Sequence, residues 1–532
     1  MQKRMTYAYC VLLLLMTVLI FRIYQINKSA YTAVSRSQGL YKLSVAQSRG
    51  VIYDRNMQPL VNESSRFVGS VMPTPQTMEA LIPRSSDEMR EILLERFHEG
   101  LPFITELPDQ GFYTTGIDIF RVPRRYSEKQ LAPHIIGYLG ANGLDGAAGI
   151  ERAFNDALIK AGSTIETRYK LDAIGHLMSG DSVTVQRSGD DIPRAGVVLT
   201  LDKYMQSVTQ AALAAGCERG AAVVLDIHTG DIIAMSSLPA FDQLNLAEAL
   251  NRSDAPFINR ATSGFSIGSV FKVLISAAAL ESGYTENHRY SCNGYIDISG
   301  QIFRCNNHTI HGDIDMGRAL QVSCNTYFID LGMKLDPRLA LALMSNLGLG
   351  RVTELAPGIE TSAGNLPDIS EFINPAAIAN FSFGQGSSLA TPLQMACAIA
   401  SVANGGVSVT PRLVLGQSSD GFTLTNPERS YSQNRVLSEK TAKTLAALMI
   451  DVVEKGSGRT AKPIRGGAGG KTSSAQTGRI TDGVEEVHAW FVGFYPADKP
   501  KYSIAVFVEG GVSGENIAGP IFKQIANGIG ML

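Results

Sequence analysis

Binding of nucleic acids and of metals would each need residues that this sequence of 532 residues has little of. The formal net charge is −2 and there is a single Trp, so no surface for nucleic acid is indicated. The six cysteines follow no metal-ligand spacing, and no Cys-x-x-Cys pair occurs. We therefore expect no metal ion, no cofactor and no nucleic-acid partner.

Charge is missing from one N-terminal segment, Met5–Phe21, which is rich in Leu, Val, Ile and Met. This run is near the short limit for crossing a bilayer, and Lys3 and Arg4 precede it. A cleaved signal peptide is the competing interpretation, but no convincing small-x-small cleavage site directly follows the run. We predict a cytoplasmic tail at 1–6 and a transmembrane anchor at 7–24. The rest of the chain is then extracellular, because positive charge marks the cytoplasmic side.

The chain is too long for one ordinary domain, and its 45% hydrophobic content is enough for substantial cores. Residues 25–190 are comparatively polar, with short alternating runs broken by Gly and Pro, and they present no nucleophile beside a base. We expect a β-rich positioning or docking module there. The composition changes near Ala195, so a second domain is expected over 191–532.

The second domain is predicted to be α+β. Strand patterns lie near both of its ends, and the segment between them is mostly helical in pattern. The expected strands include Val197–Leu201, Gly220–Ile227, Asp231–Met235, Ala489–Tyr495 and Tyr502–Glu509. Strands from the two ends can pair in one antiparallel sheet flanked by helices, with the helical segment as a lobe to one side.

The segment Ser263–Leu280 predicts a Gly-punctuated loop that leads into an apolar helix. Ser269 and Lys272 are three residues apart, so they share one face of that helix. A serine hydroxyl becomes nucleophilic when a base lies within hydrogen-bond distance, and a lysine with a lowered pKa is such a base. No other Ser-x-x-Lys occurs in the sequence. The plainer alternative is an ordinary serine at a helix start, followed by a lysine that reaches solvent.

The same segment contains a second candidate nucleophile. Gly264–Gly268 matches Gly-x-Ser-x-Gly, the pattern of an α/β-hydrolase elbow, with Ser266 as its nucleophile. That elbow follows a buried strand, whereas the preceding Pro256–Thr262 is polar and interrupted. A hydrolase that uses Ser266 is therefore the weaker alternative.

Ser323 and Asn325 lie at a break between two helical patterns, Met316–Val322 and Asn325–Met333. Side chains at such a break can point into a cleft beside the helices. Either residue can instead simply cap the second helix, since both types are favoured N-caps. This pattern alone leaves the two interpretations open.

A glycine-rich stretch, Gly466–Gly470, precedes Lys471, Thr472 and Ser473. A phosphate-binding loop is disfavoured, because the Walker spacing requires glycine where this chain has Arg465. As the edge of a strand, the same stretch offers the Lys471 cation and the Thr472 hydroxyl to a carboxylate.

Cys292 and Cys305 flank a Gly-containing segment that could turn back on itself. An extracellular location permits a disulfide between them, which would stabilise the fold by roughly 3 kcal/mol for a loop this short. We hold this disulfide as a hypothesis. Cys217, Cys324 and Cys397 are interpreted as small packing residues.

Three short motifs occur here in an order that is typical of one group of enzymes. Ser269-x-x-Lys272, Ser323-x-Asn325 and Lys471-Thr472 resemble the Ser-x-x-Lys, Ser-x-Asn and Lys-Thr-Gly motifs of penicillin-recognising serine enzymes. The chain resembles in particular a class B penicillin-binding protein, a monofunctional D,D-transpeptidase of peptidoglycan synthesis. The likeness covers nearly the whole chain, anchor included. It also includes Arg49–Asn56, Gly384–Gly386, Thr391–Met395 and Trp490–Gly493.

The resemblance implies a fold and a role for each motif. Residues 25–190 would be the N-terminal pedestal or dimerisation-like domain, and 191–532 the transpeptidase domain with the fold of serine β-lactamases. Ser269 would be the nucleophile, Lys272 its base and Ser323 the proton donor to the leaving D-alanine. Substrate binding would fall to Asn325, Lys471, Thr472 and Ser473. The backbone N–H groups of Ser269 and Ser474 would form the oxyanion hole.

The resemblance also implies partners and leaves alternatives. The substrates would be peptidoglycan stem peptides on a lipid-linked precursor polymer, β-lactams would bind covalently, and a membrane glycan polymerase would be a partner. Ser473 stands where the family usually has glycine, and a side chain facing substrate there would narrow the cleft. A β-lactamase, a membrane β-lactam sensor and an inactive scaffold for a polymerase share the fold. A role in cell elongation and shape, in division or in sporulation is left open.

Overall fold

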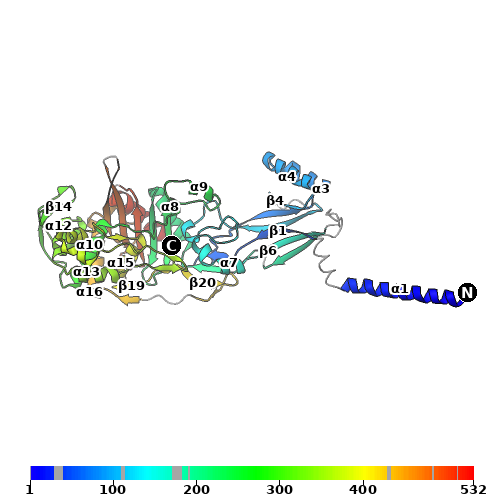
Figure 1. The fold of residues 1–532 in the computed structure, drawn as a ribbon. Coiled ribbons are helices and arrows are strands. Elements are labelled where there is room, and N and C mark those ends of the chain that lie inside the picture. Colours follow the sequence, from blue (N-terminus) through cyan, green and yellow to red (C-terminus); the bar gives the residue numbers. More distant parts are fainter. Residues whose placement is uncertain are drawn as a thin grey trace. The chain divides into compact units, whose positions relative to one another are not determined.

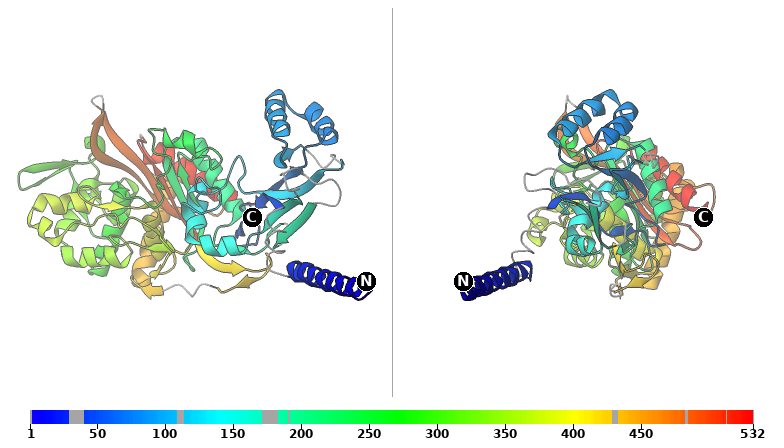
Figure 2. Two further views of the ribbon diagram at one scale, coloured as in Figure 1. Left: turned by 45° about the vertical axis from the view of Figure 1, so that its right-hand side comes forward. Right: turned by 90° about the vertical axis from the view of Figure 1, so that its right-hand side faces the viewer.

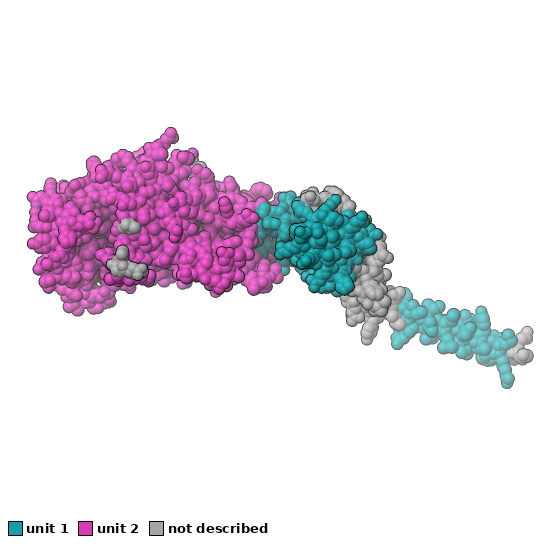
Figure 3. All heavy atoms as spheres, turned by 90° about the horizontal axis from the view of Figure 1, so that it is seen from above, with its two compact units in different colours: residues 1–49, 64–125, 162–193 teal, residues 50–63, 126–161, 194–532 magenta. Residues whose placement is uncertain are grey.

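The structure is a computed structural model of the chain. It describes residues 2–28, 40–108, 114–170, 183–189, 192–427, 433–481, 484–511 and 513–531. The chain forms two compact units, which are coloured separately in Figure 3. Unit 1 comprises residues 1–49, 64–125 and 162–193, and unit 2 comprises residues 50–63, 126–161 and 194–532.

The two units interleave along the chain, whereas the sequence predicted a single boundary near residue 190. Strand β2 (Val51–Tyr53) accounts for part of this difference, because it is buried and pairs in parallel with β8 (Gly196–Leu199) of unit 2. Helix α6 (Gly149–Ala153) likewise places the fully buried Ile150 in the core of unit 2. These stretches belong to unit 2 because their apolar side chains complete its core.

Unit 1 is rich in strands. One antiparallel sheet has the order β1-β6-β7 and another has the order β4-β3-β5. Their bounds are β1 Leu40–Gln47, β6 Thr164–Lys170, β7 Val183–Ser188, β3 Ser64–Val71, β4 Phe103–Leu107 and β5 Ile117–Arg124. Val45, Val68 and Ile165 pack together from both sheets. The helices of this unit outside the N-terminal segment are α3 Pro75–Leu81, η1 Ile82–Arg84 and α4 Asp87–Glu99.

Helix α1 (Gln2–Lys28) contains an apolar stretch of 22 residues, Arg4–Gln25, with a mean hydropathy of 2.0. About 20 apolar residues are needed for a helix to cross a bilayer. Within the part of the chain that the structure describes, this is the one helix long and apolar enough to do so. It includes the anchor expected at 7–24.

Unit 2 is built on a five-stranded antiparallel sheet with the order β10-β9-β25-β24-β23. The bounds are β9 Gly220–Asp226, β10 Ile232–Leu238, β23 Gly469–Thr481, β24 Val484–Tyr495 and β25 Tyr502–Val508. Strand β25 pairs with β9 along its whole length, so the two ends of this domain meet in one sheet, as predicted. The β23–β24 hairpin continues beyond the last residues that pair with β25, and Figure 2 shows it projecting from the sheet.

Helices cover both faces of this sheet. They are α8 Lys203–Gly216 and α17 Gly519–Ile529 on one face and α15 Pro392–Ala403 on the other, and α10 Phe271–Glu281 belongs to the same core as α15. Val224 packs in the cluster that contains α8 and α17, and its neighbour Val223 packs in the cluster that contains α10 and α15. Because both faces are buried, β9 and β25 are nearly continuous apolar runs instead of alternating ones.

Five further helices gather around α10, and Figure 1 labels most of them there. They are α11 Met316–Gln321, α12 Asn325–Met333, α13 Pro337–Asn346, α14 Pro375–Ser382 and α16 Glu439–Lys455. Unit 2 also contains shorter elements, including α5 Pro133–Ile136, α7 Asn155–Lys160, α9 Leu246–Leu250, β16 Glu354–Ala356, β17 Ile359–Glu360, β19 Val407–Val409, β20 Val414–Ser418, β21 Leu424–Thr425 and β22 Gln433–Arg435. The predicted α+β fold with a helical lobe is thus confirmed.

Candidate active site

Ser269 lies in a 3₁₀ turn, Gly268–Val270, that leads directly into α10. The turn follows a two-residue strand, β11 (Phe265–Ser266), which pairs with β18 (Leu389–Ala390). The Nε1–H of Trp490 donates to the carbonyl oxygen of Ser266 over 2.9 Å, and this bond ties the segment to the central sheet. The half-buried Ser269 is therefore held at the N-terminal end of an apolar helix.

Lys272 has a fully buried side chain, with 0% of its surface exposed. Its Nζ donates to the Asn325 Oδ1 over 2.6 Å and to the Ser323 carbonyl oxygen over 2.8 Å, and it lies 3.2 Å from the Ser323 Oγ. Burial lowers the pKa of Lys272 from 10.5 to about 7, because the charged form loses its hydration. The lysine has the burial, the contacts and the pKa that a general base needs.

Ser323 connects α11 to α12 with a backbone φ of +54°, a left-handed conformation that is uncommon for a residue other than glycine. The Cys324 N–H donates to the Ala319 carbonyl, which closes the turn. Asn325 begins α12, and its Nδ2 donates to the Arg304 carbonyl oxygen over 2.9 Å. The Asn325 side chain makes no cap, because both of its polar atoms bond elsewhere.

Lys471 and Thr472 lie near the start of β23, an edge strand of the sheet. Lys471 is fully buried, and its Nζ donates to the Thr472 carbonyl over 3.0 Å. Burial, and after it the charge of Lys272, lowers the pKa of Lys471 far below its ordinary value. The electrostatic coupling between the two buried lysines disfavours a state in which both carry a charge.

The Thr472 hydroxyl makes a 2.9 Å hydrogen bond with the Ser457 Oγ. Ser457 follows α16, and its N–H donates to the Gln321 carbonyl in α11. Sequence reasoning missed Ser457, because nothing in its local pattern distinguishes it from any other serine after a helix.

Ser473 corrects one expectation. Only 2% of its surface is exposed, and its Oγ has no hydrogen-bond partner among the described residues. It points at Gly268, where an added Cβ would lie only 2.3 Å from this Oγ. The Ser473 side chain therefore fills space beside the turn that carries Ser269 and does not project into solvent.

Ser474, the second residue expected at the oxyanion hole, is exposed on β23, and its Oγ accepts a 3.3 Å bond from the Gly514 N–H. Gly514 is confined there, since an added Cβ would lie 2.2 Å from the Ser473 carbonyl oxygen. The structure thus brings three of the predicted motifs together. Gly268 contacts β23 on one side of Ser269, and Lys272 contacts the Ser323–Asn325 turn on the other.

The competing motifs lack the surroundings they need. Ser266 sits in a two-residue strand with its carbonyl bound to Trp490, and no buried strand leads into it as in a hydrolase elbow. The glycine-rich stretch before Lys471 runs into strand β23, whereas a phosphate loop runs into a helix.

The structure has no disulfide between Cys292 and Cys305, and this corrects our hypothesis. Both are buried free thiols with their sulfurs 3.7 Å apart, and further sulfur and nitrogen atoms lie close to them. Cys397, by contrast, is buried in the main core, as expected of a packing residue.

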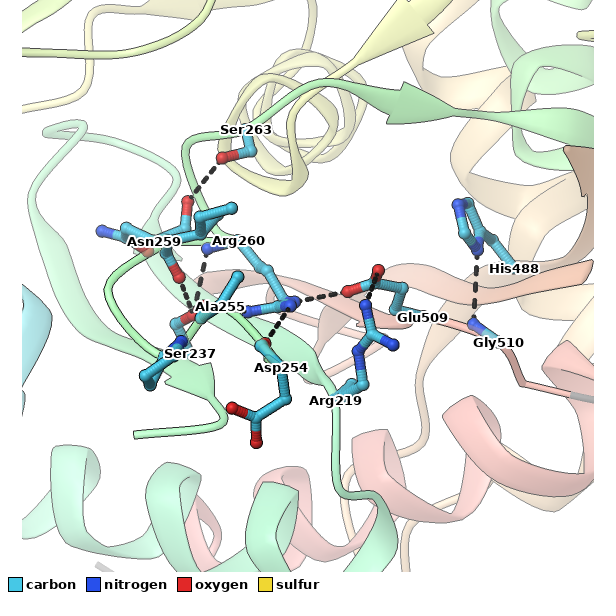
Figure 4. A network of polar contacts seen from close by, with 12 residues as sticks. Arg219, Ser237, Asp254, Ala255, Asn259, Arg260, Ser263, His488, Glu509 and Gly510 are labelled. Atoms are coloured by element: carbon cyan, nitrogen blue, oxygen red, sulfur yellow. Dashed lines mark hydrogen bonds and ion pairs between the residues drawn. The ribbon is translucent and has the colours of Figure 1, made fainter. Parts of the chain in front are cut away.

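A network of polar contacts anchors the chain just before the nucleophile turn (Figure 4). The guanidinium of Arg260 is 2% exposed and pairs with Glu509, which also pairs with Arg219. Arg260 donates as well to the carbonyls of Asp254 and Ala255, and its own N–H donates to the Ser237 Oγ. No local sequence pattern reveals this network, because its ion pairs join residues more than 200 positions apart.

Comparison with known proteins places this geometry in a family. Residues 220–527, more than half of the chain, match the penicillin binding protein transpeptidase domain. The chain belongs to this family. The class B resemblance seen in the sequence is confirmed, and its three motifs are the ones around Ser269.

Two curated relatives of this penicillin-binding protein extend over much of its length. Stage V sporulation protein D of Bacillus subtilis is 27% identical over 535 residues, which span 93% of this chain and 80% of the relative. Peptidoglycan D,D-transpeptidase PbpA of Mycobacterium tuberculosis is 30% identical over 366 residues, which span 63% of this chain and 72% of the relative.

Solved structures agree on the fold. One similar chain belongs to a structure described as "Structural coordination of polymerization and crosslinking by a peptidoglycan synthase complex". It is 25% identical to this chain, with a TM-score of 0.69, and the match covers 99% of this chain and 98% of that one. Penicillin-binding protein A of M. tuberculosis, in its ceftriaxone acyl-enzyme complex, is 22% identical, with a TM-score of 0.67 over 90% and 98%.

Proposed function

We propose that this chain is a serine-type peptidoglycan D,D-transpeptidase, which cross-links stem peptides through an acyl-enzyme on Ser269 and binds β-lactams covalently at the same residue. The observation on which this proposal mainly rests is that the buried Lys272 bonds to both Ser323 and Asn325, one helical turn from Ser269. The family match and a relative named peptidoglycan D,D-transpeptidase support the reaction type.

In the acylation step, the Ser269 Oγ attacks the carbonyl carbon between the two terminal D-alanines, and neutral Lys272 accepts the hydroxyl proton. A neutral lysine amine has two N–H donors and one lone pair. The two donors are used by the Ser323 carbonyl and the Asn325 side chain, so the lone pair is left for a serine hydroxyl. A pKa of about 7 keeps a large share of the amine neutral near pH 7.

Collapse of the tetrahedral intermediate breaks the bond between the carbonyl carbon and the nitrogen of the last D-alanine, and that nitrogen needs a proton. Ser323 supplies it, because its Oγ lies 3.2 Å from the Lys272 amine and regains a proton from there. An amine of a neighbouring peptide then attacks the ester carbon, neutral Lys272 accepts a proton from that amine and passes it to the Ser269 oxygen, and the ester bond breaks. The products are a new amide cross-link and the free serine.

Charge is stabilised by groups on both sides of Ser269. The positive end of α10 and the backbone N–H groups of Ser269 and Ser474 stabilise the oxyanion, at about 3 kcal/mol for each donor. Lys471 and Thr472 bind the terminal carboxylate, Ser473 shapes the strand beside them, and the Asn325 amide orients the peptide.

The location follows from the N-terminal helix, and the partner follows from the chemistry of the substrate. Helix α1 anchors the protein as a single-pass membrane protein, with residues 1–6 in the cytoplasm and the catalytic domain extracellular, because Lys3 and Arg4 precede the charge-free run Met5–Phe21. The peptide substrate is carried on a lipid-linked glycan polymer, so a membrane glycan polymerase acts beside the enzyme. A similar chain in a peptidoglycan synthase complex supports this partner.

The nucleophile is tested by labelling the full-length protein in detergent with a fluorescent penicillin. We expect the wild-type chain and Ser266→Ala to be labelled and Ser269→Ala to be unlabelled. Labelling that persists in Ser269→Ala would refute the assignment. Rapid release of hydrolysed penicillin would instead indicate a β-lactamase. A stable acyl-enzyme without cross-linking of a nascent glycan polymer would indicate a sensor or scaffold.

A further inference from the structure

Four side chains with metal-binding atoms meet beside the Ser323–Asn325 turn. Cys292 ends β12 (Tyr290–Cys292), Cys305 follows β14 (Gln301–Arg304), His311 precedes β15 (Gly312–Ile314), and Cys324 lies between α11 and α12. Their three sulfurs and one ring nitrogen all lie within 4.8 Å of one another.

Three of the six separations within this cluster match a tetrahedral ion. The sulfurs of Cys292 and Cys305 are 3.7 Å apart, those of Cys305 and Cys324 are 3.6 Å apart, and the Cys292 sulfur is 3.4 Å from the His311 Nδ1. Tetrahedral Zn–S bonds of about 2.3 Å and a Zn–N bond of about 2.0 Å put two sulfurs about 3.8 Å apart, and a sulfur and a nitrogen about 3.5 Å apart.

The surroundings suit bound thiolates better than plain packing. Cys292 and Cys324 are 0% exposed and Cys305 is 3% exposed. The hydroxyl of the buried Thr326 lies 3.2–3.5 Å from each of the three sulfurs, and the Gly294 N–H donates to the Cys292 sulfur over 3.4 Å. Such donors orient ligands and stabilise their negative charge.

We propose that Cys292, Cys305, His311 and Cys324 bind one Zn²⁺ ion, which fixes the turn that carries Ser323 and Asn325. Zn²⁺ fits because it takes three thiolates and one imidazole in a closed tetrahedral site, as structural zinc sites do. This assignment replaces the expectation of no metal, which rested on sequence spacing. That spacing is uninformative here, because the ligands come from separate strands and a helical turn.

The ion would act on the site through Cys324, the middle residue of Ser323-Cys324-Asn325. The Ser323 backbone is held in a left-handed conformation, and the Asn325 amide bonds to Arg304, next to Cys305. One ion bound to Cys324 and Cys305 therefore clamps the turn against β14. The bound ion would in this way keep the Ser323 and Asn325 oxygens directed at Lys272.

Zinc content of the full-length protein tests the site directly. The protein is purified in detergent without chelators or a polyhistidine tag, and metals are measured by mass spectrometry. We expect about one zinc per chain in the wild type, in Ser269→Ala and in Cys217→Ser, and a loss of at least five-fold in Cys292→Ser and His311→Ala. Equal zinc in all variants, a different stoichiometric metal, or no zinc in the wild type would overturn the site.

A second measurement needs no variant and stays valid if the substitutions unfold the protein. Thiols of the wild type are alkylated with and without a strong chelator, and modified residues are located by mass spectrometry. We expect Cys292, Cys305 and Cys324 to react at least ten-fold faster with the chelator, and Cys217 to be unaffected. Unchanged reactivity, or a disulfide between any two of the three, would overturn the proposal.

The effect on the turn is read from the rate of penicillin labelling, a readout that rests on the proposed function. We expect chelation to slow labelling at least ten-fold and added Zn²⁺ to restore it. An unchanged rate in zinc-free protein would overturn the clamping role and leave the metal site standing. The zinc content of Ser269→Ala does not depend on penicillin labelling. It therefore distinguishes a failure of the zinc proposal from a failure of the nucleophile assignment.

Discussion

Two regions on opposite sides of Ser269 are held by different forces. The packed side consists of Gly268, Gly384 and the β23 residues Ser473 and Ala475. An added Cβ on Gly268 would lie 2.3 Å from the Ser473 Oγ and 2.9 Å from the Ala475 Cβ, and one on Gly384 would lie 2.1 Å from the Gly268 carbonyl. This side is fixed by close contact, so added atoms should damage it.

The polar side consists of Lys272, Ser323 and Asn325. Hydrogen bonds of 2.6–2.8 Å fix the lysine in a fully buried position, and burial sets its pKa. Lost donors or acceptors and added protons should damage this side, and changes in volume should matter less. The comparison teaches that one nucleophile depends on two kinds of restraint, which separate experiments can break one at a time.

The largest effect is expected on the polar side. Lys272→Met should lower the rate of acylation by penicillin about 10²–10⁴-fold, because it removes the general base. Lys272→Arg should be similarly slow, since a guanidinium keeps its proton. The exposed Lys334, which pairs with Asp330 on α12, gives a matched control in Lys334→Met. A Lys272→Met rate within tenfold of wild type would mean that the base lies elsewhere.

The pH dependence of acylation sharpens the same side. Only neutral Lys272 accepts a proton, and its folded pKa is about 7. The rate should therefore be level above pH 7 and fall about tenfold for each pH unit below it. Stopped-flow labelling between pH 5 and 9 measures this, with circular dichroism at each pH as the control for unfolding. A rate that is constant from pH 5 to 7 would contradict the prediction.

The packed side is broken by Gly268→Ala. We expect a loss of unfolding free energy of about 2–4 kcal/mol, from the collision with Ser473 and Ala475 together with a φ of +62°. Gly283→Ala is the matched control, because its φ is +93° and nothing lies within 4 Å of an added Cβ. Chemical denaturation measures both variants, and equal losses would show that the close contact contributes nothing.

The smallest effect is expected from Ser473→Ala. The buried Ser473 hydroxyl has no partner among the described residues, so its removal should raise the unfolding free energy by about 1 kcal/mol. The equally buried Ser503 hydroxyl donates to the Ala396 carbonyl over 2.7 Å, so Ser503→Ala should lower it. Chemical denaturation measures the unfolding free energy of both variants. A change of the same sign in Ser473→Ala and Ser503→Ala would show that the two hydroxyls do not differ in this way.

Much of the fold was predictable because its signals are local. Thr391 caps α15 and Pro392 occupies its first turn, which are positions that these residue types favour, and the apolar strands of the sheet were found by their continuous hydrophobic runs. The ordered motifs around Ser269, Ser323 and Lys471 marked the site residues before any contact was known. Their catalytic roles stay predictions until the variants are measured.

Other features were not predictable, because they depend on contacts between distant segments. The orientation of Ser473 follows from the absence of a side chain at Gly268, which no local pattern reveals. The disulfide hypothesis considered Cys292 and Cys305 alone and missed that His311 and Cys324 reach the same point in space. The interleaving of the two units was missed because short apolar segments do not reveal which core they complete.

The sequence by itself determined which segments form the main strands and helices of the second domain, which residues carry reactive groups and in what order they occur, because these properties depend on neighbouring residues. Tertiary structure alone decided how deeply Lys272 is buried, and therefore its pKa. It alone also decided which four ligand atoms stand within reach of one ion. Burial and ligand geometry are properties of the folded chain, since both arise from segments that meet only when the core has formed.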